Sequence, residues 1–291
     1  MSNIDSYLHL RYKPKRANFK GCDPCPAFEL FDWVIWKPDA AAFYRIKIRR
    51  PKKILCLAHP KSIKLLGKFK RFLDKECTIV IAGEDTNLSQ VSYLIEQLLP
   101  YCKNIFFEAK DIELPKVQSF SMGFISYYLK RSSEGVITRL QEKLKNQEIV
   151  KEGLLASWGG VWKHLDEKLA DRKAATKFVD ESSWIQREVL EADEYWRRLA
   201  ESEFLISPAG QGVQAPKLAE AWLMHTVPIV TPNPCFRDLE KAGYPFFFVD
   251  KWQHLTPDSL VVAREQLRYV NWVEVQEMLT VKYFQKNVLK A

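Results

Sequence analysis

Short apolar runs that alternate with helix-forming segments constrain the fold of this chain more than any other feature of its sequence. In the first half, such runs predict buried strands at 54–58, 78–82, 104–107 and 117–124. Two segments with helical spacing of their apolar residues, 61–75 and 88–99, lie between the first three strands. This β-α-β-α-β order predicts a parallel sheet covered by helices.

The same pattern starts again after residue 150. The predicted strands of this half are 153–157, 177–179, 203–207, 227–231 and 246–249, and the predicted helices are 183–200, 214–225 and 257–289. A charged, helix-prone segment at 132–150 joins the halves, so we expect two domains, residues 1–140 and 141–291. Residues 1–50 show no clear period, although Ala40–Ile48 can form a short strand or helix.

Together, the two halves predict an α/β chain with two Rossmann-like β/α/β domains. Ligands of open α/β sheets bind beyond the carboxyl ends of the strands. We therefore expect the two domains to face a central cleft that holds the ligand. No sequence repeat relates the halves, so their similarity is one of pattern only.

Composition supports a globular chain with a substantial core. Of the 291 residues, 47% are apolar and 13% are aromatic, which argues against disorder. No apolar run approaches the roughly 20 residues that span a bilayer. The N-terminal segment MSNIDSYLHLRYKPKR lacks the apolar stretch of a signal peptide. We therefore expect a soluble cytoplasmic protein, located in the host cytoplasm if its source is a virus.

The six cysteines are spaced irregularly, unlike the disulfide framework of a small secreted protein. Cys22 and Cys25 form a lone C-x-x-C. A zinc site needs a second pair of ligands, and nothing in the sequence places His9 or His59 beside this motif. We interpret it as a turn with two small apolar side chains, and a metal or redox role is the alternative.

Positive charge is concentrated near the start of the chain. The formal net charge is +8, and residues 1–75 contain 18 Lys and Arg against 6 Asp and Glu. Such an excess indicates an anionic partner, which can be nucleic acid, a membrane surface or the phosphates of a substrate. A solvated basic face is the alternative.

The segment 204–230 carries the most chemical information. Its predicted strand ends at Ser207, a loop with Gly210 and Gly212 follows, and a helix starts near Gln214. Glycines let a ligand approach the backbone closely. Free N–H groups at a helix N-terminus favour phosphate. This order of elements predicts a nucleotide-binding βα turn, and an ordinary βα loop is the alternative.

Two charged residues of the predicted helix extend this interpretation. Lys217 lies in the first turn and can add a full positive charge beside a phosphate. Glu220 lies one turn deeper than Pro216 on the same face, where its carboxylate can accept hydrogen bonds from ribose hydroxyls. In the alternative, Glu220 pairs with a nearby basic side chain.

Several motifs of the second half resemble those of exostosin-like glycosyltransferases. They are Leu154-Leu-Ala-Ser-Trp-Gly-Gly160, Ser207-Pro-x-Gly, Lys217-x-x-Glu220-Ala-Trp-Leu and Val227-Pro-Ile-Val. That family shows a strand, a Ser/Pro/Gly loop, a basic residue, Glu-Ala-Leu and a Val-Pro-Val/Ile strand in the same order. The resemblance covers roughly residues 150–255, and the first half matches the family only in pattern.

The resemblance implies a GT-B fold, a nucleotide-sugar donor held mainly by the second domain, and inverting transfer without a bound metal or other cofactor. It implies that Glu220 grips the ribose and that Lys217, where the family commonly has Arg, faces the diphosphate. Lys keeps the charge but loses the bidentate fork of Arg. The implied donor site comprises Ser157, Trp158, Gly159, Gly160, Ser207, Gly210, Gln211, Gly212, Lys217 and Glu220.

Two departures from the family bear on the source and the substrate. The N-terminal membrane anchor of animal and plant members is missing, and the chain is short. Both favour a soluble form such as those of microbes or large algal viruses. The resemblance implies a donor with UDP-linked glucuronic acid, N-acetylglucosamine, galactose, arabinose or xylose, and UDP-xylose is preferred because the C-terminal pocket segment shows no extra base for a sugar carboxylate. The expected acceptor is a hydroxyl of a glycan or glycoprotein.

Inverting transfer needs a base that takes the proton of the acceptor hydroxyl. Asp85, followed by Glu84, is the preferred catalytic residue, because both lie in the loop after the predicted strand 78–82. His59 follows strand 54–58 and is a weaker choice. A solvated turn or a helix cap is the alternative for the two carboxylates.

The departing diphosphate needs positive charge or backbone amides to stabilise it. Lys217 and the loop amides fit this task, helped by Arg172 or Lys163. Trp158 and Trp162 border the expected donor loop and can stack on a base or sugar, although most tryptophans fill cores.

Nucleic-acid binding by the basic first 75 residues is the alternative function. No recognised motif of that class occurs in the sequence.

Overall fold

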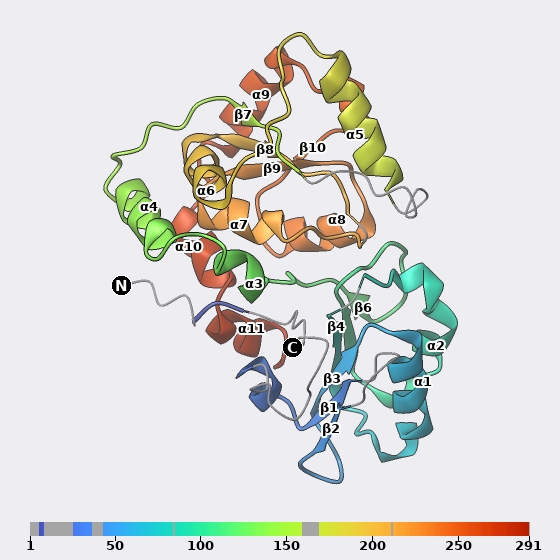
Figure 1. The fold of residues 1–291 in the computed structure, drawn as a ribbon. Helices are drawn as coiled ribbons and strands as arrows, with labels where there is room; N and C mark the ends of the chain where they lie inside the picture. Colours follow the sequence, from blue (N-terminus) through green and yellow to red (C-terminus); the bar gives the residue numbers. More distant parts are fainter. Residues whose placement is uncertain are drawn as a thin grey trace. The chain divides into compact units, whose positions relative to one another are not determined.

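The structure is a computed structural model that describes residues 6–8, 26–36, 43–83, 85–158, 169–210 and 212–290. Internal contacts divide the chain into two units, each of which is described by itself (Figure 1). The N-terminal unit comprises the described parts of Ile4–Ser126, Asn233–Leu239 and Leu279–Ala291. The C-terminal unit comprises the described parts of Tyr127–Pro232 and Glu240–Met278. The last helix of the chain thus groups with the first sheet, whereas the sequence places it in the second domain.

The N-terminal unit is built on a six-stranded sheet of order β2-β1-β3-β4-β5-β6. Its strands are β1 (Trp33–Trp36), β2 (Phe43–Ile46), β3 (Lys53–Leu57), β4 (Thr78–Ala82), β5 (Asn104–Phe107) and β6 (Val117–Gln118). Neighbouring strands pair in parallel except for β2, which pairs antiparallel with β1. The parallel sheet predicted for the first half is therefore confirmed.

Helices cover both faces of this sheet. The helical elements are η2 (Pro26–Leu30), α1 (Pro60–Lys68), η3 (Lys70–Phe72), η4 (Leu88–Gln90), α2 (Ser92–Glu96), η5 (Leu99–Tyr101) and α11 (Val281–Asn287). α1 and α2 lie on one face, and η2 and α11 lie on the other (Figure 1). On the second face Phe28, Phe31 and Phe284 pack into one hydrophobic cluster with strand residues such as Leu55.

The C-terminal unit contains a four-stranded parallel sheet of order β10-β9-β8-β7. Its strands are β7 (Leu154–Leu155), β8 (Phe204–Ile206), β9 (Val227–Val230) and β10 (Phe247–Phe248). Its main helices are α4 (Val136–Lys145), α5 (Ala170–Glu181), α6 (Ala192–Glu201), α7 (Lys217–Leu223), α9 (Pro257–Leu267) and α10 (Trp272–Met278). α5 and α9 lie on one side of the sheet, and α6 and α7 lie on the other (Figure 1). Two parallel sheets with helices make the chain a mixed α/β protein.

Three short elements complete the description. α3 (Ser126–Leu129) and α8 (Pro234–Lys241) each contain residues of both units, and η7 (Trp252–His254) follows β10. Among the described residues, no helix combines the length and apolar character that a bilayer span requires.

Some local predictions are wrong. The strand predicted at 177–179 lies inside α5, where Ala175 and Val179 are buried on one helical face. The helix predicted at 183–200 begins only at Ala192. The region 1–50, which shows no clear period, contains β1, for which no strand was predicted, whereas β2 lies within 40–48, the segment expected to form a short strand or helix. A short apolar run fits a buried strand or one face of a helix equally well, so its neighbours in the fold decide.

Candidate functional site

The Asp171 carboxylate, in the first turn of α5, accepts hydrogen bonds from three segments at the carboxyl edge of the C-terminal sheet. Its Oδ2 accepts a hydrogen bond from the backbone N–H of Ala209 at 2.7 Å. Its Oδ1 accepts from the Thr231 hydroxyl at 3.1 Å and from the Trp252 indole N–H at 2.8 Å. These three partners follow β8, β9 and β10, respectively, so a single side chain holds three connections beside the candidate ligand loop.

Arg172 places its guanidinium against the glycine loop that follows β8. A Cβ atom added to Gly210 would lie 3.0 Å from a terminal nitrogen of Arg172. The Nε of Arg172 is buried and has no hydrogen-bond partner among the residues that the structure describes. Burial lowers the pKa of Arg172, whereas Asp171 and Tyr128 raise it. Because an arginine stays protonated near neutral pH, the loop faces a cation with an unfilled donor.

Ser207, the first residue after β8, carries a second unfilled polar group. Its side chain is only 3% exposed, and within the described parts of the chain its Oγ has no partner. A buried hydroxyl without a partner costs about 1–3 kcal/mol. Ser207 in the loop and Arg172 of α5 therefore both have unused hydrogen-bonding capacity, and the positive charge of Arg172 suits an anion.

Lys217 and Glu220, at the start of α7, both contact Tyr195. Lys217 Nζ donates to the backbone oxygen of Ser157 and lies 4.5 Å from the ring centroid of Tyr195. Glu220 is 5% exposed, and its Oε2 accepts from the Tyr195 hydroxyl at 2.8 Å. The two charged residues thus belong to a cluster inside the unit, in which Tyr195 contacts both.

Burial dominates the ionisation of this cluster. It lowers the pKa of Lys217 to about 8, with Glu220 opposing the shift and Arg172 adding to it. Burial also raises the pKa of Glu220, against the effects of Lys217 and Tyr195. Both shifts favour the neutral forms, because burial penalises charge.

The shifted pKa of Lys217 predicts a measurable titration. NMR of labelled lysine amines should show Lys217 titrating near pH 8, well below the usual lysine value of about 10.4. Because the unfolded chain holds this proton more tightly, Lys217 should make the free energy of unfolding rise from about pH 8 to about pH 10.5. A Lys217 amine that titrates near the usual lysine value would contradict the burial of its charge.

Other residues of the expected donor site lie in different surroundings. Gly159, Gly160 and Gln211, with Trp162 and Lys163, lie outside the described residues. Gly212 is buried in the loop. Trp158 belongs to the hydrophobic core, where its indole N–H donates to the Thr176 hydroxyl at 3.1 Å.

In the N-terminal unit, the expected base lies at the carboxyl end of β4. Asp85 is half-buried there, whereas Glu84 lies outside the described residues. His59 caps α1, where its Nδ1 accepts from the Lys61 N–H at 3.2 Å. Asp85 and His59 therefore follow adjacent strands, as the sequence predicts.

Glu108, which directly follows β5, is a buried acid that was not among the predicted site residues. Glu108 is fully buried, and its Oε2 accepts from the Gly83 N–H at 2.7 Å. Gly83 has a φ of +95°, and a Cβ there would lie within 3 Å of Trp36. β4 and β5 pair in parallel, so the first residues after both strands share one edge. That rule could have identified Glu108 from the sequence.

Metal ligands do not gather in the described part of the chain. No group of three or more His, Cys, Asp or Glu residues is placed there to hold a metal ion. Cys56, Cys77, Cys102 and Cys235 are buried and form no disulfide with another described residue. Cys22, Cys25 and His9 lie outside the described residues, so the interpretation of the C-x-x-C motif stays a prediction.

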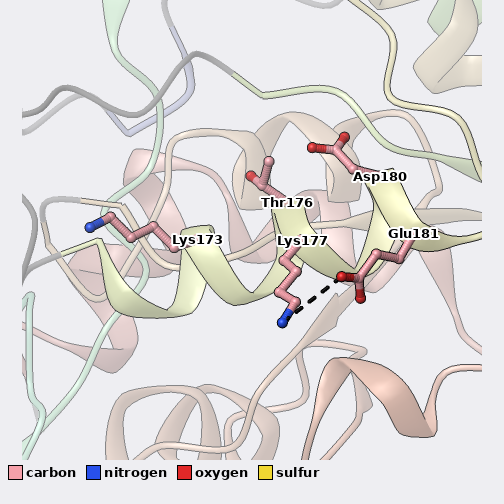
Figure 2. Close-up of a pocket in the computed structure, with 5 residues that line it drawn as sticks. All are labelled: Lys173, Thr176, Lys177, Asp180 and Glu181. Carbon is pink, nitrogen blue, oxygen red and sulfur yellow. Dashed lines mark ion pairs between the residues drawn. The ribbon is translucent and has the colours of Figure 1, made fainter.

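Figure 2 shows a pocket on α5 that is lined by Lys173, Thr176, Lys177, Asp180 and Glu181. Lys177 Nζ lies 3.9 Å from Glu181 Oε1. Two lysines and two acids from one helix give no net charge, so this pocket does not select an anion. The unfilled donors of Arg172 and Ser207 make the β8–α7 loop the stronger candidate.

Comparison with known proteins identifies no family. A scan against protein-family models finds no match, and a search of curated proteins finds no significant relative. The resemblance to exostosin-like glycosyltransferases therefore stays a prediction.

Proposed function

We propose that this protein is a glycosyltransferase that transfers a sugar from a nucleoside diphosphate sugar to a hydroxyl acceptor. The donor binds at the β8–α7 loop of the C-terminal unit, and the two units adopt the GT-B arrangement. UDP-xylose is the first donor to test, and a glycan or glycoprotein hydroxyl is the expected acceptor. The transfer inverts the anomeric centre.

One observation carries this proposal. A guanidinium with a buried, unpartnered Nε lies against Gly210, in a loop whose first hydroxyl, that of Ser207, also lacks a partner within the described residues. The loop follows the carboxyl end of a parallel strand, where ligands of α/β sheets bind. An anionic, hydrogen-bonding group such as a diphosphate satisfies these requirements.

In this proposal Arg172 takes the diphosphate-binding role that the sequence predicts for Lys217. Arg172 binds the diphosphate through its fork of donors, which suits phosphate better than the single ammonium of Lys217. Lys217, whose Nζ donates to the Ser157 backbone oxygen, positions the first turn of α7. The β8–α7 loop of the sequence motif thus forms the binding loop, and the Arg172 guanidinium of α5 supplies the positive charge.

The reaction step is a direct displacement. The acceptor oxygen forms a bond to the anomeric carbon while the bond from that carbon to the diphosphate oxygen breaks. The proton of the acceptor hydroxyl passes to the Asp85 carboxylate, the proposed base. The leaving nucleoside diphosphate carries the electron pair, and Arg172 with the loop amides stabilises its charge.

Isothermal titration of the full chain with UDP, GDP, ADP and CDP tests donor binding. We expect UDP to bind most tightly, and a panel of UDP-sugars with saccharide acceptors should then give turnover, with UDP-xylose tested first. Binding of none of the four nucleotides would reject the proposal. Turnover with another sugar would correct only the donor.

The ribose role of Glu220 has a separate test. Wild-type protein should bind UDP about tenfold more tightly than 2′,3′-dideoxy-UDP if the carboxylate accepts from ribose hydroxyls, because such bonds contribute about 1.5 kcal/mol or more. In Glu220→Gln, which keeps the size of the side chain and an oxygen for Tyr195, this preference should disappear. An unchanged preference would assign Glu220 to the buried cluster alone.

A further inference from the structure

We propose that the N-terminal unit binds the surface of anionic lipid bilayers through exposed basic residues at one end of its sheet. This basic surface is formed by Arg49 and Arg50 of the β2–β3 connection, and by Lys64, Lys68, Arg71 and Lys75 of α1 and the segment after it. The proposal is independent of glycosyl transfer, because none of these residues belongs to the donor site.

Charge is the first argument. Residues 46–75 contain eleven lysines and arginines and a single acidic residue, Asp74. All six residues of the basic surface are exposed, and none forms an ion pair with another described residue. Exposed basic residues that pair with no described acidic side chain suit an anionic partner.

Helical spacing puts two of these charges on one side. Lys64 and Lys68 lie four residues apart on α1 and share one helical face, and Arg71 in η3 and Lys75 in the turn after it follow in the chain. Ile63 and Leu66 on the other face of α1 are buried against the sheet. The basic face therefore points away from the core.

Trp33 brings the two basic segments together. Its indole N–H donates to the Ile48 carbonyl at 2.7 Å, which anchors the β2–β3 connection. Its ring contacts Phe69 at the end of α1, with centroids 6.3 Å apart. The tryptophan thus connects the segment of Arg49 and Arg50 to the helix end that carries Lys68 and Arg71.

Exposed apolar side chains favour a bilayer over nucleic acid. Ile46 is 59% exposed, Ile48 is 46% exposed and Phe72 is 45% exposed, and all three stand within a few residues of the basic side chains. Aliphatic side chains can enter the headgroup boundary of a bilayer while neighbouring lysines and arginines meet anionic lipids. Nucleic-acid surfaces rely more on aromatic stacking and contacts to phosphates.

Co-sedimentation of the full chain with vesicles tests the proposal. Vesicles of phosphatidylcholine with 30 mol% phosphatidylserine are compared with pure phosphatidylcholine at low and high salt. We expect binding only to the anionic vesicles, weakened at least tenfold in the triple variant Lys64→Glu, Lys68→Glu, Arg71→Glu, since each basic residue near the surface adds to the attraction. High salt should weaken it too, by screening.

The matched control reverses three exposed lysines of the C-terminal unit, Lys130→Glu, Lys143→Glu and Lys145→Glu, for the same change in net charge. It should bind anionic vesicles within about twofold to threefold of wild type, because distant charges act weakly across salt solution. Arg49→Glu/Arg50→Glu provides a second basic-surface variant if the triple variant fails to fold by circular dichroism.

Several outcomes would overturn the proposal. They are absence of vesicle binding, equal binding to neutral and anionic vesicles, and equal loss in the control variant. Tighter binding to a 20-base RNA than to vesicles, with loss in the triple variant, would assign the surface to nucleic acid. UDP titration of the same variants separates this result from the proposed function, because their nucleotide affinity should stay that of wild type.

Discussion

Replacing Arg172 with alanine should weaken UDP binding by about 100-fold, because the variant loses two charge-assisted hydrogen bonds of at least about 1.5 kcal/mol each. The same change should leave the free energy of unfolding within about 1 kcal/mol of wild type, since the Nε of Arg172 has no hydrogen-bond partner among the described residues. Isothermal titration and urea unfolding measure the two quantities.

Two variants sharpen this result. Arg172→Lys keeps the charge but loses the planar fork, so it should recover only part of the affinity. Arg197→Ala removes an exposed guanidinium that pairs with Glu194 on α6, and it should bind UDP as wild type does. If Arg172→Ala unfolds the protein but a folded Arg172→Lys binds UDP normally, the residue is structural and the diphosphate role is wrong.

Asp171→Ala should lower the free energy of unfolding by about 3–5 kcal/mol, the second large effect. The substitution removes the acceptor of three donors, from Ala209, Thr231 and Trp252, that reach α5 from three separate connections. A buried donor that loses its partner costs about 1–3 kcal/mol. Urea unfolding followed by tryptophan fluorescence and by circular dichroism measures the change.

The control lies on the same helix. Asp180 is exposed at the other end of α5, so Asp180→Ala should change stability by less than about 0.5 kcal/mol. Asp171→Asn keeps one acceptor oxygen, so it should lower the free energy of unfolding by an amount between those of Asp171→Ala and Asp180→Ala. An equal effect of Asp171→Ala and Asp180→Ala would show that the three connections do not depend on the Asp171 carboxylate.

The strands that hold the site were predictable from sequence because they are short apolar runs buried on both faces. β3, β4, β5, β8 and β9 match the predicted segments within a residue or two. β1 was missed, although Trp33-Val-Ile-Trp36 is such a run, because the surrounding residues show no period. Lys177–Val179 was predicted as a strand because it is a short apolar run. It lies in α5, where Val179 faces the core.

The residues of the loop were also predictable, but the direction of their side chains was not. Spacing predicts that Lys217 and Glu220 lie on one face of a helix, about one turn apart. Spacing does not determine whether this face contacts a ligand or the rest of the protein. Nearly all of α7 is buried, so the two residues meet Tyr195 of α6. The hydroxyl that meets Glu220 lies 25 residues away in the sequence.

By itself the sequence determined two parallel sheets in series and a glycine loop after β8, because burial and backbone freedom act over a few neighbouring residues. Tertiary structure decided which cation faces that loop. Asp171 holds the loops after β8, β9 and β10, and this brings Arg172 against Gly210, some 38 residues away. Contacts between residues so far apart in the sequence depend on the order in which the strands pair. A pattern over a few neighbouring residues does not contain that order.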